Sequence, residues 1–148
     1  DGTPYLWAEK LAKRLGRMPL ELHVNVLACV TRHWLRDDDT LNLYGWWPDK
    51  GEAPVLIFSV AGFDKLPPAG AETDRAIANV LVSGLTGYLA GLDAHERGAK
   101  NCPMFANDAR DLKHIVGPQV FDRSCRAKVS KAIPAELPAL DALLKLFR

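Results

Sequence analysis

The sequence contains only three cysteines, and this scarcity argues against one common class of small protein. Cys29, Cys102 and Cys125 are an odd number of thiols in 148 residues, whereas small secreted domains that rely on disulfides are rich in cysteine. We therefore expect a reducing, cytoplasmic environment. The alternative is export, in which case Cys102 and Cys125 would form a disulfide.

Long apolar runs and an excess of one charge are also missing. No uninterrupted apolar stretch approaches the roughly 20 residues that a membrane-spanning helix requires, so we expect a soluble protein without a membrane partner. The net charge is +1, which makes nucleic acid an improbable partner for the chain as a whole. The basic residues are nevertheless concentrated late in the sequence, since residues 97–148 contain ten Lys and Arg against five Asp and Glu.

Apolar periodicity predicts an α+β fold in one domain covering residues 1–148. A helix is expected over 3–16, and residues 20–26 alternate between apolar and polar side chains, as is typical of a half-buried strand. Further strands are expected over 40–44 and 55–60. Together these strands predict a small, mostly antiparallel sheet of about three to four strands.

The second half of the sequence is predicted to be helical. Apolar residues recur at helical spacing over 73–92, which predicts a long central helix packed against the sheet, and two C-terminal helices are expected over 118–131 and 135–147. Glycine lowers helix stability by about 1 kcal/mol relative to alanine. We therefore expect close backbone approach at three positions along the long helix: Gly84, Gly87 and Gly91.

Two thiols and two imidazoles lie within about thirty residues of one another in the sequence. They belong to His95, Cys102, His114 and Cys125. Sulfur and imidazole nitrogen together suit a tetrahedral Zn²⁺ site, although the spacing matches no zinc-finger pattern. A disulfide between Cys102 and Cys125, or two free buried thiols, are the alternatives.

One segment resembles a known peptidase family. Cys102-Pro-Met104 is followed, after seventeen residues, by Asp122-Arg-Ser-Cys125, which is similar to the archaemetzincin pattern of Cys-x-Met followed by Cys-x-x-Cys. Asp122 stands in place of the first cysteine of that pair. The resemblance covers roughly residues 40–131 and implies a zincin-like domain with a structural zinc site.

The chain departs from this family at the catalytic helix. Archaemetzincins carry HExxHxxGxxH, in which three histidines bind zinc and the glutamate acts as general base. When Gly91-Leu92 is matched to the family's Gly-Leu pair, the histidine positions are taken by Gly84 and Tyr88, and the glutamate position by Leu85. The resemblance therefore implies that peptidase chemistry has been lost.

The resemblance does not exclude the family's other metal site, which binds the structural zinc. Cys102 and Cys125 match two of its ligands, and His95 lies near the family's His-Cys pair. The fourth ligand is Asp122 according to the alignment, or His114 according to ligand chemistry.

Three functions follow from these patterns. The leading hypothesis is a catalytically inactive, zincin-like binding or regulatory domain with a structural zinc and a protein or peptide partner. The second is a divergent zinc-dependent hydrolase built from His95, His114 and Glu96. The third is an anion or nucleic-acid binding module that uses the late basic residues Arg110, Lys113, Arg123, Arg126, Lys128 and Lys131.

Several other chemically suggestive residues have a simpler structural explanation. Asp37-Asp38-Asp39 is expected to be a solvated turn rather than a cation site. Trp46-Trp47, with Trp34 and Tyr44, is expected to pack in the core rather than form an aromatic binding surface. Cys29 is expected to be a small core residue.

Overall fold

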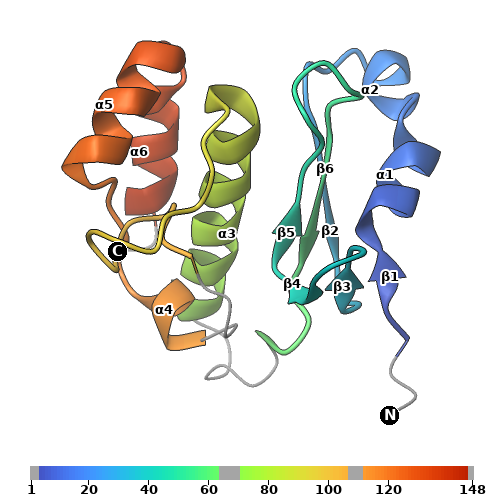
Figure 1. Cartoon of the computed structure of the whole chain (residues 1–148), viewed down its shortest axis with the longest axis horizontal. Helices are drawn as coiled ribbons and strands as arrows, with labels where there is room; N and C mark the ends of the chain where they lie inside the picture. The colour runs from blue at the N-terminus through green and yellow to red at the C-terminus, as the bar shows by residue number, and fades with distance from the viewer. Residues whose placement is uncertain (1–3, 64–70, 107–111, 147–148) are drawn as a thin grey trace. The chain divides into compact units, whose positions relative to one another are not determined.

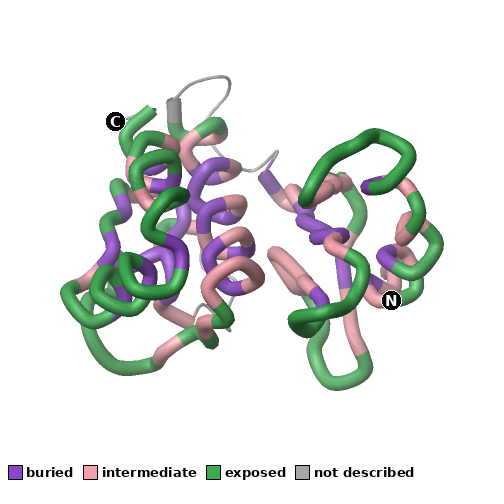
Figure 2. The backbone as a smooth tube through the Cα atoms, turned by 90° about the horizontal axis from the view of Figure 1, so that it is seen from above, coloured by how far each residue is buried: buried purple, intermediate pink, exposed green. Residues whose placement is uncertain are grey.

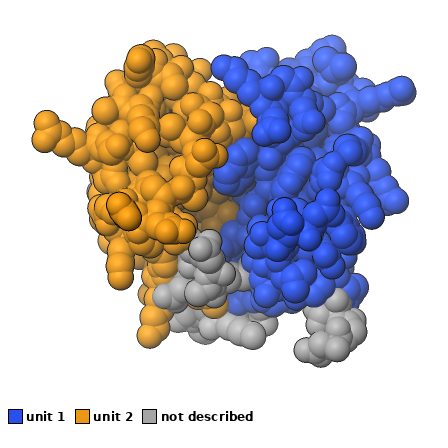
Figure 3. Space-filling view, in the orientation of Figure 1, with its two compact units in different colours: residues 1–62 blue, residues 63–148 orange. Residues whose placement is uncertain are grey.

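The structure is a computed structural model that describes residues 4–63, 71–106 and 112–146. The chain gathers into two compact units, residues 1–62 and 63–148 (Figure 3). Arg110, one of the late basic residues, and the outer ends of the helices expected over 3–16 and 135–147 lie outside the described residues. The predicted α+β class is confirmed, and whether the two units fold as the one expected domain stays a prediction.

The first unit contains two three-stranded sheets, with strand orders β1-β3-β4 and β2-β6-β5 (Figure 1). Pairing is parallel between β1 and β3 and between β2 and β6, and antiparallel between β3 and β4 and between β5 and β6. The expected antiparallel character therefore holds for only half of the described pairs. The elements are β1 Leu6–Trp7, α1 Ala8–Leu15, α2 Met18–Glu21, β2 Leu27–Thr31, β3 Leu35–Arg36, β4 Leu41–Leu43, β5 Gly45–Trp46 and β6 Val55–Ser59.

Strand β6 lies at the centre of the first unit's core. All five of its residues are buried; it pairs with β2 and β5 at its two edges, and α1 packs against it. A continuous apolar run such as Val55 to Phe58 is typical of a buried strand. The buried core cluster of this unit consists of Ala8, Ala12, Leu35, Val55 and Ile57.

The strand expected over residues 20–26 is wrong. Pro19 lies in the first turn of α2, which ends at Glu21, and His23 adopts a left-handed backbone with φ of 53°. The apolar side chains of Leu20 and Leu22 are 79% and 53% exposed, so their alternation reflects no buried face. The strand begins later, at Leu27, where the chain pairs with β6.

The second unit is built around the long helix α3, Ala71–Ala90, which packs against three shorter helices. These are α4 Leu112–Val116, α5 Arg123–Ala132 and α6 Leu137–Lys145 (Figure 1). Figure 2 shows buried residues concentrated on the inner faces of these helices. Among the described helices, none combines the length and apolar character needed to cross a membrane.

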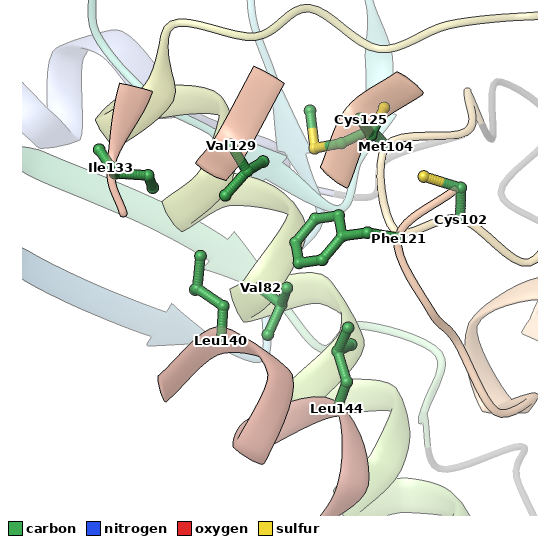
Figure 4. Close-up of a cluster of buried hydrophobic side chains, with 9 residues drawn as sticks. All are labelled: Val82, Cys102, Met104, Phe121, Cys125, Val129, Ile133, Leu140 and Leu144. Carbon is green, nitrogen blue, oxygen red and sulfur yellow. The ribbon is translucent and has the colours of Figure 1, made fainter. Parts of the chain in front are cut away.

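The core of the second unit joins α3, α5 and α6 to the loop that precedes α4. Its buried members are Val82, Cys102, Met104, Phe121, Cys125, Val129, Ile133, Leu140 and Leu144. Figure 4 shows the two cysteines at one side of this cluster, with Leu140 and Leu144 at another. The thiols therefore sit at the margin of a packed core, next to the loop that carries His95.

The three glycines expected along the long helix differ in their positions relative to it. Gly84 and Gly87 are buried within α3. Gly91, by contrast, follows the end of the helix with φ of 63°, and a Cβ there would meet no atom within 4 Å. The expected close approach at Gly91 is therefore wrong, because this glycine supplies the left-handed residue with which many helices end.

Candidate metal centre

Four side chains of the second unit converge on one point. They are those of His95, Cys102, Asp122 and Cys125, and one potential ligand atom from each lies within 4.8 Å of all the others. Three of these residues are among the four predicted from the sequence. The fourth is Asp122, the position that the alignment had offered.

His95 is held by the loop that follows α3. Its backbone N–H donates to the carbonyl oxygen of Met104 at 2.8 Å, and its own carbonyl accepts from Ala106 at 2.9 Å, which forms a short parallel bridge with Phe105. The Phe105 ring meets the imidazole edge to face, with 5.8 Å between ring centres. Backbone and ring together fix the direction of the imidazole.

Cys102 is fixed by a turn in the same loop. Its N–H donates to the Ala99 carbonyl at 2.9 Å, and its carbonyl accepts from the N–H of Phe105 at 3.0 Å. Its side chain is fully buried. Because the bridge holds both ends of this segment, Cys102 and His95 are presented to the same point although six residues separate them in sequence.

Asp122 has two structural roles. It is the N-cap of α5, where its Oδ1 accepts a hydrogen bond from the backbone N–H of Cys125 at 2.8 Å. Its Oδ2 lies 3.4 Å from Nε2 of His95. An N-cap aspartate satisfies a backbone donor that the helix leaves free, so the helix start itself carries the carboxylate to the site.

The two thiols are free and lie against each other. Cys102 and Cys125 are both buried and unbridged. The pKa of Cys125 is raised from 9.0 to about 12, first by burial and then by the charge of and hydrogen bond with Cys102, with a further contribution from Asp122. Without a cation, the thiolate form of Cys125 is therefore strongly disfavoured.

Gly98 lies close to this group and was not singled out from the sequence. It has φ of 120°, and a Cβ at this position would lie 3.0 Å from Asp122 Oδ2 and 3.6 Å from the His95 ring. A side chain here would therefore strain the loop and crowd two of the four donors. Glycine inside a loop between candidate ligands is the only sequence signal that could have drawn attention to it.

The buried imidazole of His95 indicates that this group of side chains can bind a metal ion. Both ring nitrogens are buried, and neither makes a hydrogen bond with the described residues; Asp122 Oδ2, 3.4 Å from Nε2, lies at ion-pair distance without forming one. Leaving buried polar atoms unpaired costs about 1–3 kcal/mol each, whereas a metal ion at the centre of the group would engage one nitrogen directly. Two sulfurs, one nitrogen and one carboxylate oxygen are donors that fit a metal ion.

His114 lies outside the group. Its Nε2 is 2.6 Å from the carbonyl oxygen of Lys100, and its ring is tilted against Phe105 with 5.8 Å between ring centres. It therefore contacts the backbone of the loop between His95 and Cys102. The structure does not bring its nitrogens together with the four donors.

The remaining candidates do not join the site. His23, His33 and Glu96 are exposed, and the first two lie in the other unit. Asp37 closes a turn, since its Oδ1 accepts from the N–H groups of Asp39 and Thr40. Residues with packing roles in the first unit are Cys29 and Trp46, which contact its core cluster, and Trp34, which lies against Gly62.

Comparisons with known proteins add no relative: no family model matches the chain, and neither curated proteins nor solved structures gave a match.

Proposed function

We propose that this chain is a zincin-like domain without peptidase activity, in which a structural Zn²⁺ is held by His95, Cys102, Asp122 and Cys125. Its role would be to bind or regulate a protein or peptide partner. The observation that carries the proposal is the convergence of these four donor side chains within 4.8 Å of one another.

The donor chemistry favours zinc over other common ions. Tetrahedral zinc binds sulfur at about 2.3 Å and nitrogen or oxygen at about 2.0–2.2 Å, so its donors lie roughly 3.3–3.8 Å apart. The separation of 3.4 Å between His95 Nε2 and Asp122 Oδ2 is already in this range. Calcium and magnesium require mostly oxygen donors, and this group offers only one carboxylate.

The charges also suit a divalent cation. Two thiolates and one carboxylate would bring three negative charges to the ion, and neutral imidazole would complete the set. Metal binding would thereby remove the proton that burial keeps on Cys125, since thiols coordinate as thiolates. A bound cation would stabilise the negative charge that burial disfavours on these thiols.

A site of this kind is closed. Four protein donors fill a tetrahedral zinc and leave no position for the water that a hydrolase activates. Its location favours a structural role, because His95 and Cys102 come from the loop after α3 while Asp122 and Cys125 begin α5. Zinc would tie these two segments together beside the buried core.

Helix α3 lacks the side chains that peptidase chemistry requires in the similar family. Gly84, Leu85 and Tyr88 occupy the positions at which the similar family carries two histidines and a glutamate. Glycine and leucine offer no side-chain ligand or base, so a hydrolytic metal cannot be held there as it is in that family. A binding or regulatory role is the function that remains for a zincin-like domain of this composition.

The test combines metal content, stability and activity. The reduced 148-residue chain, dialysed against buffered zinc, is expected to retain one zinc, to unfold at a lower temperature in a chelator, and to hydrolyse no member of a broad peptide panel. His95→Ala should lower zinc affinity, whereas His33→Ala, a change at an exposed histidine in the other unit, should not. Peptide hydrolysis that disappears in His95→Ala but persists in His33→Ala would replace this proposal with the divergent hydrolase.

A further inference from the structure

The two sulfur donors of the candidate metal centre are direct neighbours. Cys102 and Cys125 are 0% and 4% exposed, and neither forms a disulfide. Their sulfur atoms belong to a group whose ligand atoms all lie within 4.8 Å of one another. They are the only two described thiols in the second unit, since Cys29 lies on β2 of the first.

From this placement we infer that the metal centre is a reversible redox switch, in which a peroxide oxidises Cys102 and Cys125 to a disulfide and the zinc ion is released. The inference rests on the proposed function, because it requires a bound zinc. It adds a mode of regulation to a site that would otherwise be only structural.

The chemistry of the step balances with peroxide as the oxidant. One thiolate attacks a peroxide oxygen, so that the O–O bond breaks, hydroxide leaves and the sulfur becomes a sulfenic acid. The second thiolate attacks that sulfur, forms the S–S bond and displaces the second hydroxide. Two thiolates lose two electrons in total, and the peroxide that gains them ends as two water molecules after protonation.

Oxidation would release the zinc ion because too few donor atoms would remain to hold it. A disulfide sulfur is a poor ligand compared with a thiolate, so oxidation would leave only His95 and Asp122 to hold the ion. A site with four thiolates would keep two of them after forming a single disulfide, whereas this site would keep none. The replacement of thiolates by imidazole and carboxylate is therefore what makes one oxidation event sufficient.

The four donors differ in their exposure to solvent. The thiols are buried, but the side chains of His95 and Asp122 are 23% and 14% exposed. The loop residues Glu96 to Lys100 beside them are exposed. These two donors are more exposed than the thiols, so we expect peroxide to reach the sulfurs from the imidazole and carboxylate side.

The consequence would be a local change in the second unit. In the oxidised state the Cys102–Cys125 disulfide joins the Cys102 end of the loop to α5, whereas His95 loses the link to α5 that zinc supplied. Asp122 Oδ1 still caps α5 through Cys125 N–H, so helix α5 would persist while the segment around His95 is held only by its own backbone and ring contacts. A partner that recognises this loop would then sense the redox state.

The test uses the full chain with Cys29→Ser, which removes the thiol of the first unit without touching the site. The reduced, zinc-loaded protein is titrated with hydrogen peroxide, and released zinc is followed with a chromophoric chelator. We expect one zinc released per peroxide consumed, a mass decrease of two hydrogen atoms per chain, a Cys102–Cys125 bond in peptide mapping, and recovery of zinc binding after addition of a thiol reductant.

The other outcomes separate the two proposals. A reduced protein that binds no zinc would overturn both the proposed function and this inference. Zinc that binds but stays bound when peroxide is stoichiometric, or leaves only as sulfinic acid forms without recovery, would overturn the switch alone and leave the structural zinc intact. Because both metal-site cysteines are retained in the tested protein, misfolding of a ligand variant cannot account for any of these results.

Discussion

The backbone N–H of Cys125 donates a 2.8 Å hydrogen bond to Oδ1 of Asp122. This contact makes one residue both the cap of α5 and a donor of the candidate metal centre, because the other carboxylate oxygen lies 3.4 Å from His95 Nε2. The start of the helix and the metal group are thereby formed by the same side chain. The two roles can be separated by substitution.

Asp122→Asn should retain the cap and weaken the metal site. Asparagine caps helices about as well as aspartate, so the free energy of unfolding in a chelator should be nearly unchanged, whereas Asp122→Ala should lose about 1 kcal/mol. Both variants should bind zinc more weakly, since neither supplies a carboxylate. Urea unfolding in chelator and competition with a chromophoric chelator measure the two effects, and unaltered zinc affinity in Asp122→Asn would exclude the aspartate as a ligand.

Gly98→Ala should weaken zinc binding as well as the fold. The added Cβ would lie 3.0 Å from Asp122 Oδ2, in a residue with φ of 120°. Gly51→Ala is a matched control, because Gly51 has φ of 104° but nothing within 4 Å of the added atom. Backbone strain of this kind costs about 1–3 kcal/mol, so both variants should be less stable, and only Gly98→Ala should lose zinc affinity. Equal zinc binding by the two variants would contradict the placement of Gly98 beside the donors.

The stability of the metal-free protein should fall at high pH. Burial, reinforced by the neighbouring Cys102, raises the pKa of Cys125 from 9.0 to about 12. A thiol with a raised pKa in the folded state contributes stability that is fully present below its unfolded pKa and is lost as the pH rises through the folded value. Urea unfolding in chelator and reductant should therefore show a decline above about pH 9 that is smaller in Cys125→Ser.

Zinc should remove this pH dependence, since a coordinated Cys125 is already a thiolate. The informative quantity is the difference between the Cys29→Ser protein with and without zinc over the same pH range. Cys29→Ser is the suitable background because burial also raises the pKa of Cys29. Identical declines with and without zinc would mean that the metal does not contact Cys125.

Leu140→Ala should destabilise the second unit by about 2–5 kcal/mol, the range for leucine truncation in a packed core. Leu140 is 3% exposed and belongs to the cluster that contains both cysteines. Leu146 is 64% exposed, so Leu146→Ala should change stability by no more than about 0.5 kcal/mol. Similar losses for the two variants, measured by urea unfolding, would contradict the packing of α6.

The fold was predictable where side-chain pattern and burial coincide. The run from Val55 is buried throughout and is a strand, and the apolar face of α6 follows from Leu140 and Leu144 at helical spacing. The prediction failed over residues 20–26, because alternation alone does not reveal whether the apolar side chains have anything to pack against. There, Pro19 and the left-handed His23 favour a short helix and a turn.

The candidate site was predictable in its cysteines and in His95, but its fourth member was not settled. His114 has the better ligand chemistry, yet it lies outside the group and contacts the Lys100 carbonyl. Asp122 had a local signal, since an aspartate directly before a helix is a preferred N-cap. What the sequence could not supply is the path of the loop from His95 to Cys102, because it depends on the bridge between His95 and Phe105.

X-ray absorption at the zinc edge of the reduced 148-residue chain identifies the atoms that bind the ion. We expect one zinc per chain whose coordination shell contains two sulfurs at about 2.3 Å and two nitrogen or oxygen donors at about 2.0–2.2 Å. A reduced chain without stoichiometric zinc, or a bound zinc whose coordination shell contains no sulfur, would contradict the proposed zinc site.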